Sequence, residues 1–126
     1  MTDTADIRGF HAHVYFDAET RTTAVQLRDS IAQRFGVSVG ALHDRPVGPH
    51  EKAMFQVKFA PEQFAAVVPW LMVNRQALSV LVHPQTGDEI GDHDERPLWM
   101  GEVLPLDIEW MRRALAALTT NGGSHA

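Results

Sequence analysis

The stretch Gly9-Phe-His-Ala-His-Val-Tyr-Phe16 alternates strictly between two kinds of side chain. One side of the alternation is apolar and consists of Phe10, Ala12, Val14 and Phe16. The other side carries His11, His13 and Tyr15. A period of two residues predicts a β-strand with one face in the core and one polar face. The strand therefore places two histidines side by side on a face outside the core.

The segments that follow this strand carry alternating helix and strand signals. Residues 17–35 have apolar side chains at three- and four-residue steps, which predicts an amphipathic helix. Strands are predicted at 37–43 and 53–59, separated by a turn region rich in proline and glycine. A second helix is predicted from Pro61 toward Asn74, and Pro69 should kink or split it. The next strand is predicted at 77–83 and should end at Pro84.

The order strand, helix, strand, strand, helix, strand predicts an α+β fold, a ferredoxin-like βαββαβ sandwich. Its four-stranded antiparallel sheet should place the fourth strand beside the first, followed by the third and the second. Both helices should cover one face. We expect a single domain over residues 1–126. It comprises a core at about 9–84, an irregular tail at 85–106, a C-terminal helix at 107–118 and a disordered end at 119–126.

The other sheet face is left open by this arrangement, and the two-residue period predicts which side chains it carries. They are His11, His13, Tyr15, Met54, Gln56, Lys58, Leu81 and His83. Because the fourth strand runs antiparallel beside the first, His83 should lie near His11. The set His11, His13 and His83 is therefore a candidate group of metal ligands. A single histidine on such a face is more often solvated than a ligand, so the hypothesis depends on the convergence of three.

Three further histidines fall in predicted loops. They are His43, His50 and His93. We interpret them as acid/base groups, as alternative ligands or as surface residues. The sequence alone leaves these three interpretations open.

The composition limits which metal ligands and which binding partners the chain can use. The chain has 126 residues, no cysteine and a formal net charge of −5. Without cysteine, the available ligands are imidazoles and carboxylates such as Asp44, Asp92 or Glu102, which favours non-heme Fe(II), with Zn, Ni or Mn as alternatives. The negative charge argues against nucleic-acid binding. No targeting segment and no membrane-spanning stretch is visible, so we expect a cytoplasmic protein.

Short strings distributed along the chain carry a family resemblance. They are His11-Ala-His-Val-Tyr-Phe16, His43-Asp-Arg-Pro-Val-Gly-Pro-His50, Met54-Phe-Gln-Val57, Leu78-Ser-Val-Leu-Val-His-Pro84, Thr86-Gly-Asp88, Asp92-His93 and Leu98-Trp-Met-Gly-Glu102. Together they resemble the DOPA 4,5-dioxygenase family of the fungal type, over about residues 10–105. The resemblance implies a dimeric ferredoxin-like fold. It also implies extradiol ring cleavage of catechols such as L-DOPA, with O2 and Fe(II).

If the resemblance holds, roles follow for the remaining polar residues. His50 and His93 are assigned as acid/base groups, because histidine titrates near neutral pH, and Tyr15 as a hydrogen-bond donor. Arg45 is expected to pair with the carboxylate of an amino-acid substrate, and His43 is expected to contact the substrate.

Two other functions remain open. The domain could be a non-enzymatic ligand-binding module, or a metal-dependent enzyme of another type such as a lyase or a hydrolase. In each case we expect a homodimer formed through the open sheet face. Tyr15, Met54 and Leu81 would leave apolar area there, and bare apolar patches usually mark interfaces.

Overall fold

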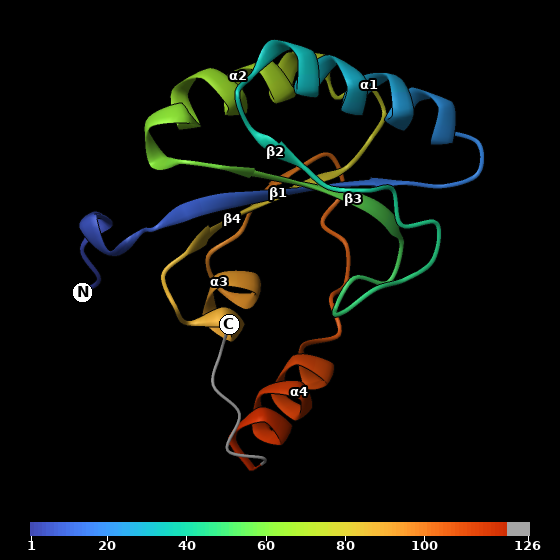
Figure 1. The fold of residues 1–126 in the computed structure, drawn as a ribbon. Helices are drawn as coiled ribbons and strands as arrows, with labels where there is room; N and C mark the ends of the chain where they lie inside the picture. Colours follow the sequence, from blue (N-terminus) through green and yellow to red (C-terminus); the bar gives the residue numbers. More distant parts are fainter. Residues whose placement is uncertain (121–126) are drawn as a thin grey trace.

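Figure 1 shows the computed structural model, which describes residues 1–120. Its strands are β1 (Gly9–Phe16), β2 (Ser38–Val39), β3 (Ala53–Phe59), β4 (Val80–Gln85) and β5 (Leu98–Met100). Its helices are α1 (Arg21–Arg34), α2 (Phe64–Asn74), α3 (Glu89–Asp94) and α4 (Ile108–Thr120), with short 3-10 turns at Thr4–Asp6 and Pro61–Gln63. The predicted disordered end at 119–126 lies outside the described residues, apart from the last two residues of α4.

The five strands form one sheet in the order β2-β3-β1-β4-β5, and all neighbours are antiparallel. The first four strands have the predicted ferredoxin-like order, so the α+β fold is confirmed. Helices α1 and α2 lie together on one face of this sheet (Figure 1). The register pairs His11 with His83 on one side and with Lys58 on the other. That register positions the candidate site.

The main core lies between the sheet and helices α1 and α2. The strands contribute side chains that are fully or almost fully buried, among them Ala12, Val14, Phe55, Val57, Val80 and Val82. The helices contribute Ala24, Leu27, Ile31, Val67, Val68 and Leu71. The apolar half of the β1 alternation therefore packs as predicted. Burial of this face fixes the register, because a slip by one residue would turn every side chain to the other side.

The second face of the sheet is not open, which corrects the predicted arrangement. Residues 85–106 are not an irregular tail: they form α3 and β5, and β5 adds a fifth strand beside β4. Helices α3 and α4 lie on the side of the sheet opposite α1 and α2 (Figure 1). Leu104 and Leu106, together with Trp99 of β5, pack on Tyr15, Met54 and Leu81, which are at most 4% exposed. The apolar area expected to hold a dimer is therefore covered by the same chain.

Three local predictions also need correction. Helix α2 continues through Pro69 without splitting, because Val67, Val68 and Leu71 anchor both of its halves in the core. Strand β4 continues through Pro84 to Gln85. Proline is tolerated there because β5 pairs with β4 only from Val80 to Val82, so Pro84 lies at an edge.

The third correction concerns the predicted strand at 37–43, which is reduced to Ser38–Val39 and an isolated bridge between His43 and Met54. The backbone leaves the ladder near Gly40, whose carbonyl accepts a hydrogen bond from Arg28 Nε at 2.7 Å. The predicted final helix is present: Asp107 caps it by accepting a hydrogen bond from the Trp110 N–H, and its residues run from Ile108 to Thr120.

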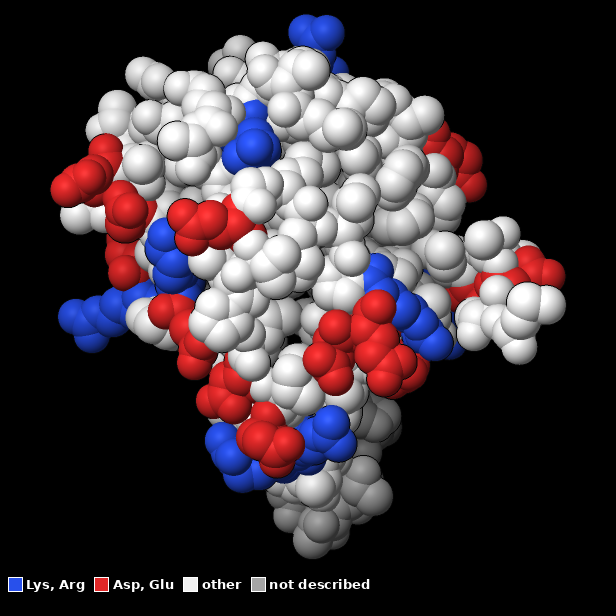
Figure 2. Space-filling view, turned by 180° about the vertical axis from the view of Figure 1, so that it is seen from behind, with Lys and Arg blue, Asp and Glu red and all other residues white. Residues whose placement is uncertain are grey.

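Two surface observations complete the fold. No helix within residues 1–120 has both the length and the apolar composition needed to cross a membrane. On the face shown in Figure 2, Lys and Arg side chains are scattered among Asp and Glu side chains, and they form no continuous basic patch.

Candidate metal centre

Five histidines from four parts of the chain meet on the second face of the sheet, beneath α3. Strand β1 contributes His11 and His13, strand β4 contributes His83, the segment before β3 contributes His50, and α3 contributes His93. The ring of His13 is central: its centroid lies 4.1 Å from that of His50, 5.2 Å from that of His83 and 6.1 Å from that of His93. All except His11 are less than 9% exposed.

The predicted ligand set is brought together. The candidate ligand atoms of His11, His13 and His83 all lie within 4.8 Å of one another. The cause is the antiparallel register, which pairs His11 directly with His83, while the two-residue period puts His13 on the same face. A second group with the same spacing consists of His13, His50 and His93. The cluster therefore offers two overlapping sets of three imidazoles.

Several rings are fixed by their outer nitrogen, as metal-ligating histidines usually are. His83 Nδ1 donates to the carbonyl of Pro84 at 2.9 Å, and His93 Nδ1 donates to the carbonyl of Glu89 at 2.8 Å. A carbonyl can only accept, so the proton sits on Nδ1 and the lone pair of each ring lies on Nε2. His83 Nε2 lies 3.1 Å from His13 Nε2. Two nitrogens on one ion, with bonds of about 2.0–2.1 Å, would have a similar separation.

Two buried nitrogens lack a hydrogen-bond partner within the described part of the chain. They are His11 Nε2 and His13 Nδ1. Buried polar atoms are normally paired, because an unpaired one forfeits its hydration. The unpaired His11 Nε2, in a cluster without thiolates, suits a borderline metal ion such as Fe(II) or Zn(II). The residues present therefore fit a bound metal.

Burial and nearby charges keep His11, His13, His50 and His83 neutral. Burial lowers the pKa of His83 from 6.5 to about 3 and the pKa of His50 to about 4, and the neighbouring histidines add to both effects. The pKa of His11 falls to about 4, chiefly through burial and next through the charge of Lys58. Burial also holds the pKa of His13 well below its usual range. Neutral imidazole is the form that binds metals.

Tyr15 connects the cluster to the apolar floor beside it. Its hydroxyl lies 2.7 Å from His50 Nδ1, and its ring stacks on Trp99 with centroids 6.0 Å apart. Burial raises the pKa of Tyr15 well above its ordinary value. The phenol therefore keeps its proton and can donate it in a hydrogen bond.

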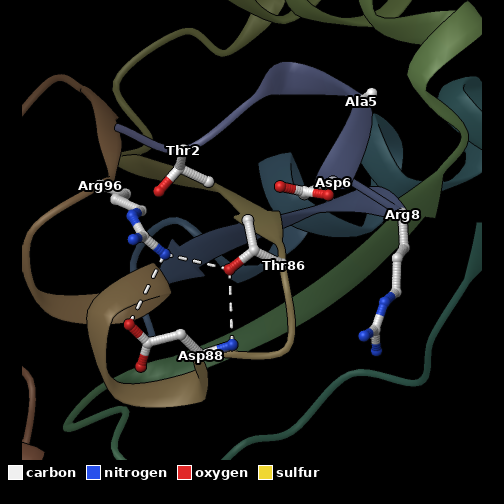
Figure 3. A pocket seen from close by; sticks show the side chains of 7 residues that line it. All are labelled: Thr2, Ala5, Asp6, Arg8, Thr86, Asp88 and Arg96. Carbon is white, nitrogen blue, oxygen red and sulfur yellow. Dashed lines mark hydrogen bonds and ion pairs between the residues drawn. The ribbon is translucent and has the colours of Figure 1, made fainter.

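No carboxylate belongs to either group of candidate ligands found in residues 1–120. Asp92 is only 3% exposed, but its oxygens accept hydrogen bonds from the Thr86 N–H, the Thr86 hydroxyl and Arg96. Arg96 also lies 3.6 Å from Asp88, and both side chains line a hollow beside α3 (Figure 3). These contacts tie α3 to the end of β4 and thereby position His93.

The remaining predicted site residues lie outside the cluster. His43 and Arg45 are exposed in the segment between β2 and β3, and Asp44 of the same segment forms an ion pair with Arg21 at 2.7 Å. Glu102 is exposed. The sequence assigns His50 and His93 as acid/base groups or alternative ligands, but it does not show that they lie on the same face as the β1 histidines. The string Asp92-His93 was the available signal, but its position depends on α3.

Comparisons with known proteins agree with this geometry. The model of the Dopa 4,5-dioxygenase family matches residues 10–110, which include all five clustered histidines. The chain belongs to the Dopa 4,5-dioxygenase family. The match supports the resemblance drawn from the short sequence strings.

Three relatives of this family member are informative. An uncharacterized 21.2 kDa protein of Botryotinia fuckeliana is 43% identical over 120 residues, covering 85% of this chain and 66% of that protein. The DOPA 4,5-dioxygenase of Amanita muscaria is 33% identical over 113 residues, covering 82% of this chain and 50% of that enzyme. The solved structure of a candidate dioxygenase from Nostoc punctiforme is 52% identical, with a TM-score of 0.89, covering 90% of this chain and 99% of that one.

The coverage of these relatives is unequal. This family member spans about half of the Amanita enzyme and about two thirds of the Botryotinia protein, whereas it spans nearly all of the Nostoc chain. The fold is therefore shared over nearly the whole of the solved relative.

Proposed function

We propose that this protein is an extradiol ring-cleaving dioxygenase that acts on L-DOPA or a related catechol with O2. The observation that carries the proposal is the cluster of five largely buried histidines, two of which have nitrogens without hydrogen-bond partners. Membership of the Dopa 4,5-dioxygenase family supports the reaction class. The activity named for the Amanita relative supports the catechol substrate.

His11, His13 and His83 would hold the metal, with Fe(II) as the first choice and Zn, Ni or Mn as possible occupants of a purified sample. Bound Fe(II) would supply Lewis acidity toward the catechol hydroxyls and an electron source for O2. Every other task falls to the chain itself. His13 and His83 present facing nitrogens 3.1 Å apart, which supports the choice of this set.

His50 and His93 would carry protons. Each is buried beside His13, and each has one nitrogen held by a fixed partner, Tyr15 for His50 and the Glu89 carbonyl for His93. His93 Nε2 then carries the lone pair and would accept a proton from a catechol hydroxyl, whereas His50, whose Nδ1 accepts from Tyr15, carries its proton on Nε2 and would donate it to the product. Tyr15 keeps the orientation of His50. His50 and His93 also form the second candidate ligand group together with His13, so both are alternative metal ligands.

Positioning of the substrate is the second task of the chain. Arg45 was assigned to a substrate carboxylate and His43 to a substrate contact. Both remain predictions, supported by their exposure in the segment that leads to His50. The homodimer and the cytoplasmic location also remain predictions. The dimer now rests on the family resemblance alone, because the chain itself covers the apolar area near Tyr15.

A non-enzymatic ligand-binding module and a metal-dependent enzyme of another type are the alternatives. They are separated by loading the protein with Fe(II) and following O2 consumption with L-DOPA and with unsubstituted catechol. We expect O2 uptake and a yellow ring-opened semialdehyde. Iron that is bound without any consumption of O2, across a panel of catechols, would contradict the dioxygenase function and favour one of the alternatives.

A further inference from the structure

The face that carries the histidines is fully covered at the end near Tyr15, the closed end, and only partly covered at the end near His11, the open end. At the closed end, Trp99, Leu104 and Leu106 pack over Tyr15 and its apolar neighbours. Burial then decreases along β1, since Tyr15 and His13 are each 2% exposed whereas His11 is half-buried. Beyond the cluster, beside His11, lies the exposed Lys58 of β3. His11 and Lys58 therefore form the most exposed edge of the histidine face.

Lys58 faces the site because of the strand register. It is the direct partner of His11 in the antiparallel pair of β1 and β3, so both side chains leave the same face of the sheet. Directly opposed residues have Cβ atoms about 4.5–5.5 Å apart. The charge of Lys58 also contributes to the lowered pKa of His11, after burial. The field of the ammonium group therefore reaches the edge of the cluster.

The charge of Lys58 is not balanced by a neighbour. None of the ion pairs among residues 1–120 includes it, although the whole chain has a net charge of −5. Its partners across the sheet are His11 and Ser38, and the next residue of β3 on the same face is Gln56. No carboxylate is among these neighbours. An unpaired cation at the entrance of a site attracts and orients anionic ligands.

We propose that Lys58 binds the anionic group of the substrate at the open end of the histidine site. The preferred substrates are then catechols whose side chain ends in a carboxylate. This inference rests on the proposed function, because it assumes that the two catechol hydroxyls face the histidines. With that orientation the ring substituent points toward the open end, beside Lys58. A lysine ammonium on a flexible stem can follow carboxylates on side chains of different length.

Arg45 is the competing cation, and the fold separates the two. Arg45 precedes β3, on the side of the apolar floor, where His43 pairs with Met54. Lys58 lies near the other end of β3, on the side of His11. Binding by Arg45 would place the substrate carboxylate on the side of the apolar floor, whereas binding by Lys58 would place it on the side of His11.

The test compares dihydrocaffeate with its uncharged amide, which have the same catechol ring and nearly the same shape. Anaerobic calorimetric titration of the Fe(II)-loaded protein measures binding without turnover. The wild-type protein should bind the carboxylate about fivefold more tightly than the amide, the gain expected of one partly exposed ion pair. Lys58→Met should reduce this ratio to about one without changing the affinity for the amide. Lys58→Arg should restore the preference.

Lys52 is the only other lysine and provides the matched control. Lys52→Met should keep the wild-type ratio, and raising the salt concentration should lower the ratio in the wild-type protein and in Lys52→Met. A wild-type ratio retained in Lys58→Met, or lost in Arg45→Met, would overturn the role of Lys58 while leaving the proposed function intact. Failure of both catechols to bind the iron-loaded protein would overturn the proposed function and this inference together.

Discussion

Acidification should destabilise the metal-free protein through its buried histidines. The folded-state pKa values of His50 and His83 are lowered from 6.5 to about 4 and about 3. In the unfolded chain both groups titrate near their ordinary value. Between the folded-state pKa values and the unfolded-state value of 6.5, the unfolded chain binds more protons than the folded chain, so the free energy of unfolding falls as the pH falls. The stability is present above pH 6.5 and is lost progressively as the pH falls toward the folded-state pKa values.

The magnitude follows from the linkage relation. At pH 5, a histidine that is neutral in the folded state and titrates at 6.5 in the unfolded state lowers the free energy of unfolding by about 2 kcal/mol. His50 and His83 are only 4% and 2% exposed, so solvent screens little of this effect. Together they should remove about 4 kcal/mol between pH 7 and pH 5. That is a large part of the about 5–15 kcal/mol that stabilises a typical domain.

The assay is urea unfolding in the presence of a chelator at several pH values, followed by tryptophan fluorescence. His83→Gln should reduce the difference in the free energy of unfolding between pH 7 and pH 5 by about 2 kcal/mol, independently of how much the substitution itself changes stability at pH 7. His43→Gln removes an exposed imidazole outside the cluster and is the matched control. Equal stability of the wild-type protein at the two pH values would show that the buried histidines do not control its acid stability. An equal change of the pH dependence in His83→Gln and His43→Gln would show the same.

Three further predictions concern single side chains of the site. His13→Ala should lower the metal content measured by elemental analysis, because His13 belongs to both groups of candidate ligands. An unchanged metal stoichiometry in the folded variant would show that the metal does not bind to this face of the sheet. His50→Ala should slow turnover about a hundredfold while keeping its metal, as expected for a proton carrier, whereas loss of metal would make His50 a ligand. Asp92→Asn should lower the free energy of unfolding by about 1–3 kcal/mol, because the variant loses a buried carboxylate that accepts hydrogen bonds from Thr86 and Arg96. A denaturation midpoint equal to that of the wild-type protein would show that these hydrogen bonds do not stabilise the fold.

The part of the fold that could be predicted is the part with a strong hydrophobic period. Strand β1 shows this most clearly: its alternation placed His11 and His13 on one face, and the antiparallel neighbour then brought His83 beside them. Period and topology were sufficient because burial of one face excludes a shifted register.

The rest of the site depends on elements too short to leave a period. Helix α3 has six residues and β5 has three, so neither gives an alternation or an amphipathic pattern that can be recognised. Yet α3 carries His93, and β5 carries Trp99, which covers Tyr15. The position of α3 is set by Asp92, Thr86 and Arg96, contacts that only the folded chain brings together. Sequence reasoning therefore left the second face open and its fourth and fifth histidines in loops.

Dioxygen insertion into a catechol ring at the histidine cluster is tested by mass spectrometry of the product that the Fe(II)-loaded protein forms from L-DOPA and oxygen-18-labelled O2. His13→Ala is treated identically. We expect the wild-type protein to form a ring-opened product that carries oxygen from O2 and has the composition of substrate plus one O2, and we expect His13→Ala to lose this product. A product that has only lost two hydrogen atoms, as a quinone has, or equal product formation by His13→Ala, would contradict this expectation.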